Sequence, residues 1–306
     1  MAAYRFPDVP DVDEVEVPRR HRVWRAALWE LSVQVVLALI LLFFVRNRAV
    51  QPSMRIFWSA VLACVPALLW VVLTWQAQRR TLEPRPYLFR VFLLSALLAN
   101  AVTAPLIEAL IEPGRWLNSA SLLTRLFGFS LTVGLMLEFT KFIVLRVLVW
   151  PSHYRIRMDA IAYGLASGLG VALVLNLRYA LVEGGGQLHV AMIHIMSQTL
   201  VQQAIGLVTS LGLMNQLPER AGALVLPSHV LGAAMLQGLY AVIRTGIVVR
   251  GFGLGATANS PLLALVFGAV FPLIVYGVVA FLVVNADMRE QQRIQGPGTI
   301  GLEDAG

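Results

Sequence analysis

Long apolar runs, most of about 20 residues, recur along this chain of 306 residues and constrain its fold more than any other feature. A helix of that length crosses the roughly 30 Å hydrocarbon core of a bilayer. Apolar residues make up 58% of the chain and charged residues only 13%, which excludes an ordinary soluble domain. The sequence therefore predicts an all-α fold, a polytopic membrane helix bundle with about eight transmembrane helices.

The predicted spans define one membrane domain, residues 27–285, between polar tails at residues 1–26 and 286–306. The second tail is rich in Gly and Gln and is expected to be disordered. The first span follows a polar tail and lacks a small-residue cleavage site, so we interpret it as a retained span and not as a signal peptide. The spans are expected at residues 27–45, 56–75, 88–111, 122–150, 159–182, 190–213, 222–243 and 260–285.

The distribution of arginine predicts the orientation of the bundle, because short cytoplasmic loops carry an excess of basic residues. With alternating spans, most arginines lie on the side of the N-terminus. The other side has only Arg46, Arg48, Arg55, Arg115, Arg244 and Arg250. Both termini are therefore expected in the cytoplasm. The net charge of +7 is explained by these loops, and no aromatic-interleaved basic patch indicates a nucleic-acid partner.

Two charged side chains, Glu138 and Lys141, lie deep inside the apolar run 122–150. A charge near the middle of a spanning helix costs about 2.5–3.5 kcal/mol on insertion scales, so it normally faces the bundle interior and has a partner. Residues three apart share one helical face, which lets the two side chains neutralise each other. Lys141 is also the only lysine in the chain. Helix physics alone leaves a structural ion pair and a functional site as equal alternatives.

A polar stripe marks the run 190–213, where His194, Gln198 and Gln202 recur at four-residue intervals. Lipid cannot satisfy these groups, so the stripe must face protein or water. Hydrogen bonding between helices is sufficient to explain it. In the preceding run, the spacing of Gly164 and Gly168 predicts a close approach by a neighbouring helix.

The order of these residues resembles the PrsW family of polytopic intramembrane peptidases over about residues 130–285. That family has Glu-Glu-x-x-Lys in one span, and then Asp, Tyr-Gly, Gly-x-Gly and Glu-Asn-x-x-Tyr in the next. A later span carries a His near its start, and a final span contains His-Gly. The matching residues here are Glu138, Lys141, Asp159, Tyr163, Gly164, Gly168, Gly170, Asn176, Tyr179 and His229.

Three positions depart from the family pattern: Leu137 and Leu175 replace glutamates, and Tyr276 replaces a histidine. Activating water inside a membrane needs a general base or a metal held by about three ligands. The resemblance leaves Glu138 and His229 as candidate catalytic residues. Supporting roles would fall to Lys141, Asn176, Tyr179, His194 and Tyr276. A divalent metal such as zinc is left open as a cofactor.

The resemblance implies a multi-pass protein of the bacterial cell membrane whose partners are transmembrane helices of single-span proteins. Our first hypothesis is a catalytically degenerate member that serves as a helix-binding or regulatory scaffold. The second is an active endopeptidase with Glu138 as general base and His229 as its partner. A transporter is the third, although the sequence shows no clear internal repeat or broken helix. Whether the chain is an enzyme stays open at this level.

Overall fold

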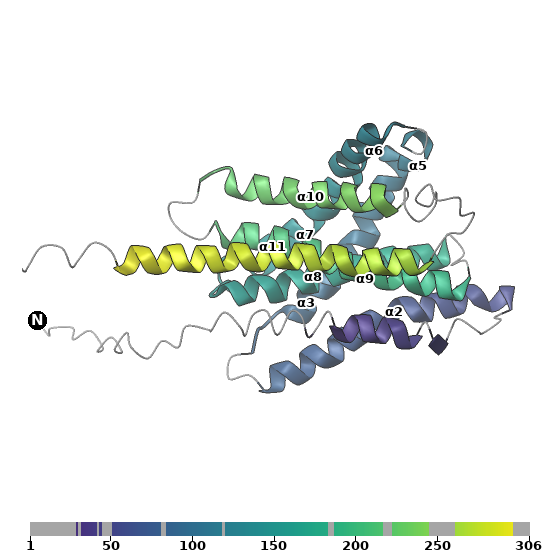
Figure 1. The fold of residues 1–306 in the computed structure, drawn as a ribbon, viewed down its shortest axis with the longest axis horizontal. Helices are drawn as coiled ribbons and strands as arrows, with labels where there is room; N and C mark the ends of the chain where they lie inside the picture. Colours follow the sequence, from purple (N-terminus) through teal and green to yellow (C-terminus); the bar gives the residue numbers. More distant parts are fainter. Residues whose placement is uncertain are drawn as a thin grey trace, which may run out of the picture.

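The computed structural model describes residues 29, 32–41, 43–44, 51–80, 84–117, 120–182, 187–216, 222–244 and 261–295. These segments are helices joined by turns, without a strand among them, so the predicted all-α membrane bundle is confirmed (Figure 1). The N-terminal tail predicted over residues 1–26 lies outside the described residues. So do most of residues 286–306, but α11 continues to Gln295, and the first ten residues of that tail are therefore helical and not disordered.

The helices follow the predicted spans closely. A short apolar helix at Ser32–Leu41 precedes the labelled elements. One continuous helix combines α3, η2, α4 and η3, and another combines α6, η4 and α7; the η segments are π-helical turns. The bounds are α2 Pro52–Arg80, α3 Leu88–Leu98, η2 Ala99–Thr103, α4 Ala104–Leu106, η3 Ile107–Ile111, α5 Pro113–Trp116, α6 Leu122–Phe129, η4 Ser130–Gly134, α7 Leu135–Leu148, α8 Arg157–Leu181, α9 Leu188–Met214, α10 Val225–Ile243 and α11 Pro261–Gln295.

Five helices among the described residues are long and apolar enough to cross a membrane, so the count of eight spans is not confirmed. They are Ser53–Arg79, Leu88–Trp116, Arg157–Leu181, Val225–Ile243 and Val266–Val283. Helix α9 is not among them although it has 27 residues. Its glutamine, serine and threonine side chains lower its hydropathy.

Helix α9 can be this polar because it is the central helix of the bundle. It packs against α8, α10, α11 and α2, and most of its side chains are buried. Figure 1 shows α10 on one side of it and α2 on the other. The closest approach is to α8, where a Cβ added to Gly164 would lie 2.8 Å from the carbonyl oxygen of Gly206. The glycine spacing in α8 therefore serves contact with α9.

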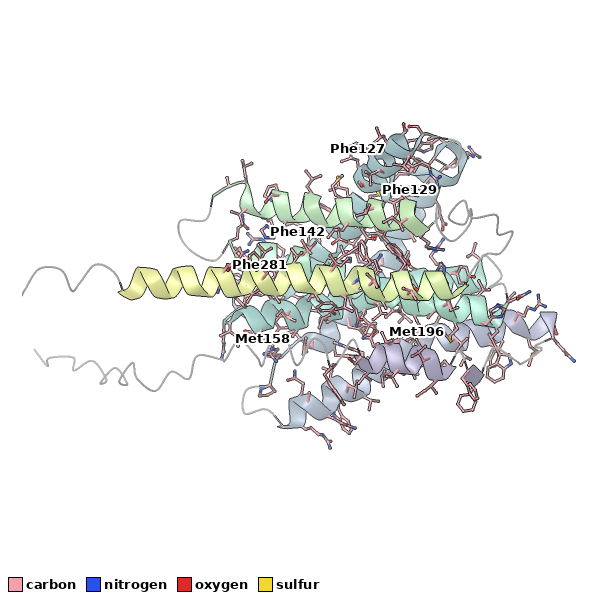
Figure 2. All side chains as sticks on the ribbon, viewed as in Figure 1. Phe127, Phe129, Phe142, Met158, Met196 and Phe281 are labelled. Atoms are coloured by element: carbon pink, nitrogen blue, oxygen red, sulfur yellow. The ribbon has the colours of Figure 1, made fainter. Side chains whose placement is uncertain are left out.

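The outer surface is apolar, as expected for helices that face lipid. Phe281 on α11, labelled in Figure 2, is 62% exposed, and phenylalanines on α6 and α7 also project outward. This surface cannot be stable in water over such an area. Together with the spanning helices, it makes the protein a multi-pass membrane protein.

The turn between α7 and α8 closes one end of the bundle. Trp150 Nε1 donates to the carbonyl oxygen of Leu213 at 2.9 Å, and the Tyr163 hydroxyl donates to that of Pro86 at 2.7 Å. The span predicted over residues 159–182 begins two residues earlier, at Arg157. The Asp159 carboxylate, in the first turn of α8, reaches back and accepts hydrogen bonds of 3.0 Å from the backbone N–H groups of Arg155 and Ile156. It thereby satisfies donors that a helix start leaves unpaired.

Candidate functional site

A fully buried ion pair occupies the interior between α7, α9 and α10. Lys141 Nζ lies 2.6 Å from Glu138 Oε1, and both side chains are 0% exposed. Gln237 Nε2 donates to the same oxygen at 3.0 Å, and Thr209 Oγ1 donates to Oε2 at 2.6 Å. Both carboxylate oxygens therefore have protein donors. The predicted pairing of Glu138 with Lys141 is confirmed by this geometry.

A pair of amides extends this network toward the middle of α9. Gln202 and Gln237 exchange hydrogen bonds of 3.0 and 2.8 Å through their side-chain amides. The polar stripe of α9 therefore faces protein at this point. Thr209 was not singled out from the sequence, although it lies seven residues after Gln202, on the same helical face. The seven-residue spacing from Gln202 is the sequence feature from which Thr209 could have been predicted to join this network.

The positions next to these polar groups are apolar. Leu137 is 4% exposed and belongs to a cluster with Ala96, Ala99, Val171 and Val174. Leu175 packs against the same cluster. The two leucines that replace family glutamates thus meet in one apolar region between α3, η2, α7 and α8. No water-activating group is present at either position.

His229 lies near the ion pair but has partners of its own. Its Nδ1 is 2.7 Å from the carbonyl oxygen of Val225, which can only accept, so Nδ1 carries the proton. Nε2 is 3.4 Å from Asn215 Nδ2. The backbone of α9 packs against His229 at Gly212, one turn beyond Thr209, which is about 4.5 Å along the helix axis. Within the described segments, His229 forms its hydrogen bonds with Val225 and Asn215 and none with Glu138.

Asn176 is bound farther along α9. Its Nδ2 donates to Thr199 Oγ1 at 3.0 Å and to the carbonyl oxygen of Ile195 at 3.3 Å, whereas its Oδ1 is buried without a hydrogen-bond partner. Thr199 precedes Thr209 by ten residues, about 15 Å along the axis. Asn176 therefore lies in the same polar interior as Glu138 but contacts α9 at a different height along the helix axis.

His194 and Tyr179 form a separate group at the opposite end of α9. Their rings stack with centroids 3.8 Å apart, and Arg244 Nη2 donates to His194 Nδ1 at 2.7 Å. From His194 to Gly212, beside His229, the distance along α9 is about 27 Å. His194 therefore cannot complete a site with His229. Tyr276, on α11, is half-buried against the main apolar core.

The fold and this interior define a polytopic helical membrane protein that keeps an ion pair at the contact of three helices. The profile of the PrsW family of intramembrane metalloproteases matches residues 83–286, and the chain belongs to this family. No curated protein and no solved structure matches the chain.

A metal ion of the kind that this family's description implies does not fit the residues present. His229 has the orientation of a ligand, because a carbonyl group holds its Nδ1–H. A catalytic metal needs about three such ligands. Across the described parts of the chain, no group of three His, Cys, Asp or Glu side chains is placed to provide them. Lys141, Gln237 and Thr209 already occupy the oxygens of Glu138.

Proposed function

We propose that this protein is a non-proteolytic member of the PrsW family, a pseudoenzyme that binds a transmembrane helix of a single-span protein without cleaving it. The observation that carries the proposal is the packing of Leu137 and Leu175 into one apolar cluster beside Glu138. A leucine can neither accept a proton from water nor hold a metal. Loss of one positioned acid or base typically lowers a rate by about 10²–10⁴, so loss of two or more takes turnover below detection.

The role of the remaining carboxylate supports the same proposal. Glu138 is closed in by Lys141, Thr209 and Gln237, with no exposed surface from which water could approach. The hydrogen bonds from Thr209 and Gln237 to Glu138 link α7 to α9 and α10. Taking one partner away would leave an uncompensated charge in the interior, which explains why Glu138 and Lys141 are present although the neighbouring glutamate positions are leucine.

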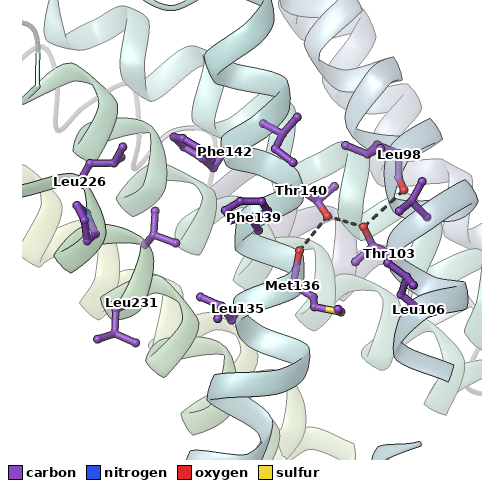
Figure 3. Close-up of a pocket in the computed structure, with 14 residues that line it drawn as sticks. Leu98, Thr103, Leu106, Leu135, Met136, Phe139, Thr140, Phe142, Leu226 and Leu231 are labelled. Carbon is purple, nitrogen blue, oxygen red and sulfur yellow. Dashed lines mark hydrogen bonds between the residues drawn. The ribbon is translucent and has the colours of Figure 1, made fainter. Parts of the chain in front are cut away.

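A lateral groove supplies a surface for a partner helix. It has a volume of about 540 Å³ and lies between the α3–α4 helix, α7 and α10. Figure 3 shows Phe139 of α7 between Leu231 of α10 and Leu106 of α4, with the Thr103 and Thr140 hydroxyls bonded to each other in the wall. A helix is about 10–12 Å wide with its side chains. The groove would therefore receive side chains from one face of a helix and not the whole helix.

Cross-linking tests the helix-binding part of the proposal. The purified chain, with a photoreactive residue in the groove, would be reconstituted with a panel of tagged single-span proteins. We expect cross-links to intact partners. Leu231→Trp, which fills the groove, should abolish them, whereas Leu282→Trp on α11 should not. Leu282 is a matched control for Leu231 because the two side chains are 50% and 47% exposed. Equal cross-linking by both variants would contradict the proposal.

A cleavage assay in the same vesicles tests the pseudoenzyme part. We expect no product from the wild type or from Glu138→Ala. The variant with Leu137→Glu, Leu175→Glu and Tyr276→His restores the family residues and is the informative comparison. Robust cleavage by the wild type would contradict the proposal and favour the rival function, an active endopeptidase using Glu138 and His229. Uptake of a solute that depends on Glu138 would instead favour a transporter.

A further inference from the structure

A second cavity lies outside the ion-pair site, at the end of the bundle where α2 ends and α3 begins. Its volume is about 610 Å³, and its walls include Trp70, Val72, Trp75, Leu88 and Phe89. The cavity opens toward the lipid-facing side, since Val72, Trp75 and Phe89 are all exposed. An apolar ligand that enters from the bilayer would fill it.

Three arginines lie at this cavity: Arg85 and Arg90 line it, and Arg79 lies over the ring of the lining residue Trp75. The guanidinium carbon of Arg79 lies 3.8 Å from the ring centroid of Trp75, and that of Arg90 lies 4.9 Å from the ring centroid of Tyr87. Both side chains are exposed. A guanidinium that lies over an aromatic ring still has N–H donors for an anion. The aromatic rings therefore position two cations at the mouth of the cavity.

The third arginine at the mouth already has a partner. Arg85 Nε lies 2.8 Å from Asp159 Oδ1, an ion pair that fixes the α2–α3 turn to the start of α8. Among the described residues, no carboxylate forms an ion pair with Arg79 or Arg90. The local charge thus stays positive, and a negatively charged group would complement it.

We propose that this cavity binds one anionic phospholipid, with an acyl chain between α2 and α3 and the phosphate held by Arg79 and Arg90. The arrangement of apolar cavity and basic mouth distinguishes a lipid from a free phosphate, which would leave the apolar walls uncovered. The distribution of arginine places this end in the cytoplasmic leaflet, where anionic lipids are enriched. Basic pockets between transmembrane helices on that side are suited to such headgroups.

Native mass spectrometry tests the proposal on the full-length protein, released from vesicles of equal parts phosphatidylglycerol and phosphatidylcholine. We expect one phosphatidylglycerol to be retained in preference to phosphatidylcholine. Each arginine near a membrane surface contributes about fivefold to the affinity, so Arg79→Gln with Arg90→Gln should weaken retention about 25-fold. The control, Arg55→Gln with Arg115→Gln, removes the same charge at the other end of the bundle and should leave retention unchanged.

A second variant separates the acyl chain from the headgroup. Val72→Phe fills the cavity and keeps both arginines, and we expect it to lower retention as well. Glycerol phosphate, which has the anion without the chain, should not displace the lipid. Displacement by glycerol phosphate, equal retention of phosphatidylcholine, or unchanged retention in the Arg79/Arg90 variant would each overturn the proposal. These readouts do not depend on proteolysis or on partner binding.

Discussion

Thr209 on α9 donates a hydrogen bond of 2.6 Å to Glu138 Oε2 on α7 and so connects the buried ion pair to the central helix. Gln237 makes the corresponding bond from α10. The carboxylate therefore joins three helices. Helices in lipid are held together by close packing and by polar contacts of this kind, because burial from water does not drive them together. We accordingly expect Glu138 to make a large contribution to the free energy of unfolding.

Replacing Glu138 alone should destabilise the protein more than replacing the whole ion pair. Glu138→Ala leaves the Lys141 ammonium buried without its partner, at a cost of about 3–5 kcal/mol. Glu138→Ala combined with Lys141→Met removes both charges and should recover much of this loss. Unfolding in mixed detergent micelles measures the difference. A double variant no more stable than Glu138→Ala would show that the lysine is not the source of the effect.

Thr209→Val should weaken the contact between α7 and α9. It removes one hydrogen bond to a charged group and should lower the free energy of unfolding by about 1–3 kcal/mol. Thr132→Val is the control, since the Thr132 hydroxyl bonds within its own helix, to the carbonyl oxygen of Gly128. Equal effects of both changes in the same unfolding assay would argue against a special role for Thr209.

Two glycines in helices should respond oppositely to alanine. At Gly164 a methyl group would lie 2.8 Å from the carbonyl oxygen of Gly206, so Gly164→Ala should destabilise the α8–α9 contact by about 1–3 kcal/mol. At Gly232 a Cβ meets nothing within 4 Å. Gly232→Ala should therefore be neutral or stabilise the protein by about 0.4–1 kcal/mol. The midpoint of thermal unfolding compares the pair directly, and a similar loss in both would refute the packing argument.

Labelling with an impermeant thiol reagent should show both termini on the cytoplasmic side. The expectation rests on the excess of arginine on that side of the predicted spans. Single cysteines would be introduced into a Cys64→Ser background, one in residues 1–20 and one after Gln295. Modification of either position in intact cells, before lysis, would rule out this orientation.

The ion pair could be predicted from the sequence, because spacing and the cost of a buried charge both constrain it. Glu138 and Lys141 were expected to pair across one turn, and they do. Membership of the PrsW family, suggested by residues such as Asn176 and Tyr179, is likewise confirmed. Local spacing was sufficient to predict the ion pair, and the order of the motifs was sufficient to predict the family.

The partners of the other polar residues could not be predicted, since they depend on which helices meet. His194 was expected to have a supporting role, and it contacts Arg244, whose nearness requires that α9 and α10 be antiparallel neighbours. Asn176 and Glu138 both match the family pattern, and their hydrogen bonds to α9 are made about 15 Å apart along the helix axis. The arginine-bordered cavity between α2 and α3 was also missed, because it depends on how the end of α2 and the start of α3 are placed relative to each other.

The polarity of α9 has a consequence for the biogenesis of the protein. A helix with this many glutamines and hydroxyl groups partitions poorly into lipid by itself, whereas α8, which ends at Leu181 just before α9 begins at Leu188, is apolar enough to span. The translocon should therefore admit the two helices together, with Gly164 and Gly206 already in contact. A reporter fused after α9 should stay on the cytoplasmic side when α8 is deleted, because α9 would then have to enter the membrane without the helix that covers its polar face; a translocated reporter would show that α9 inserts by itself.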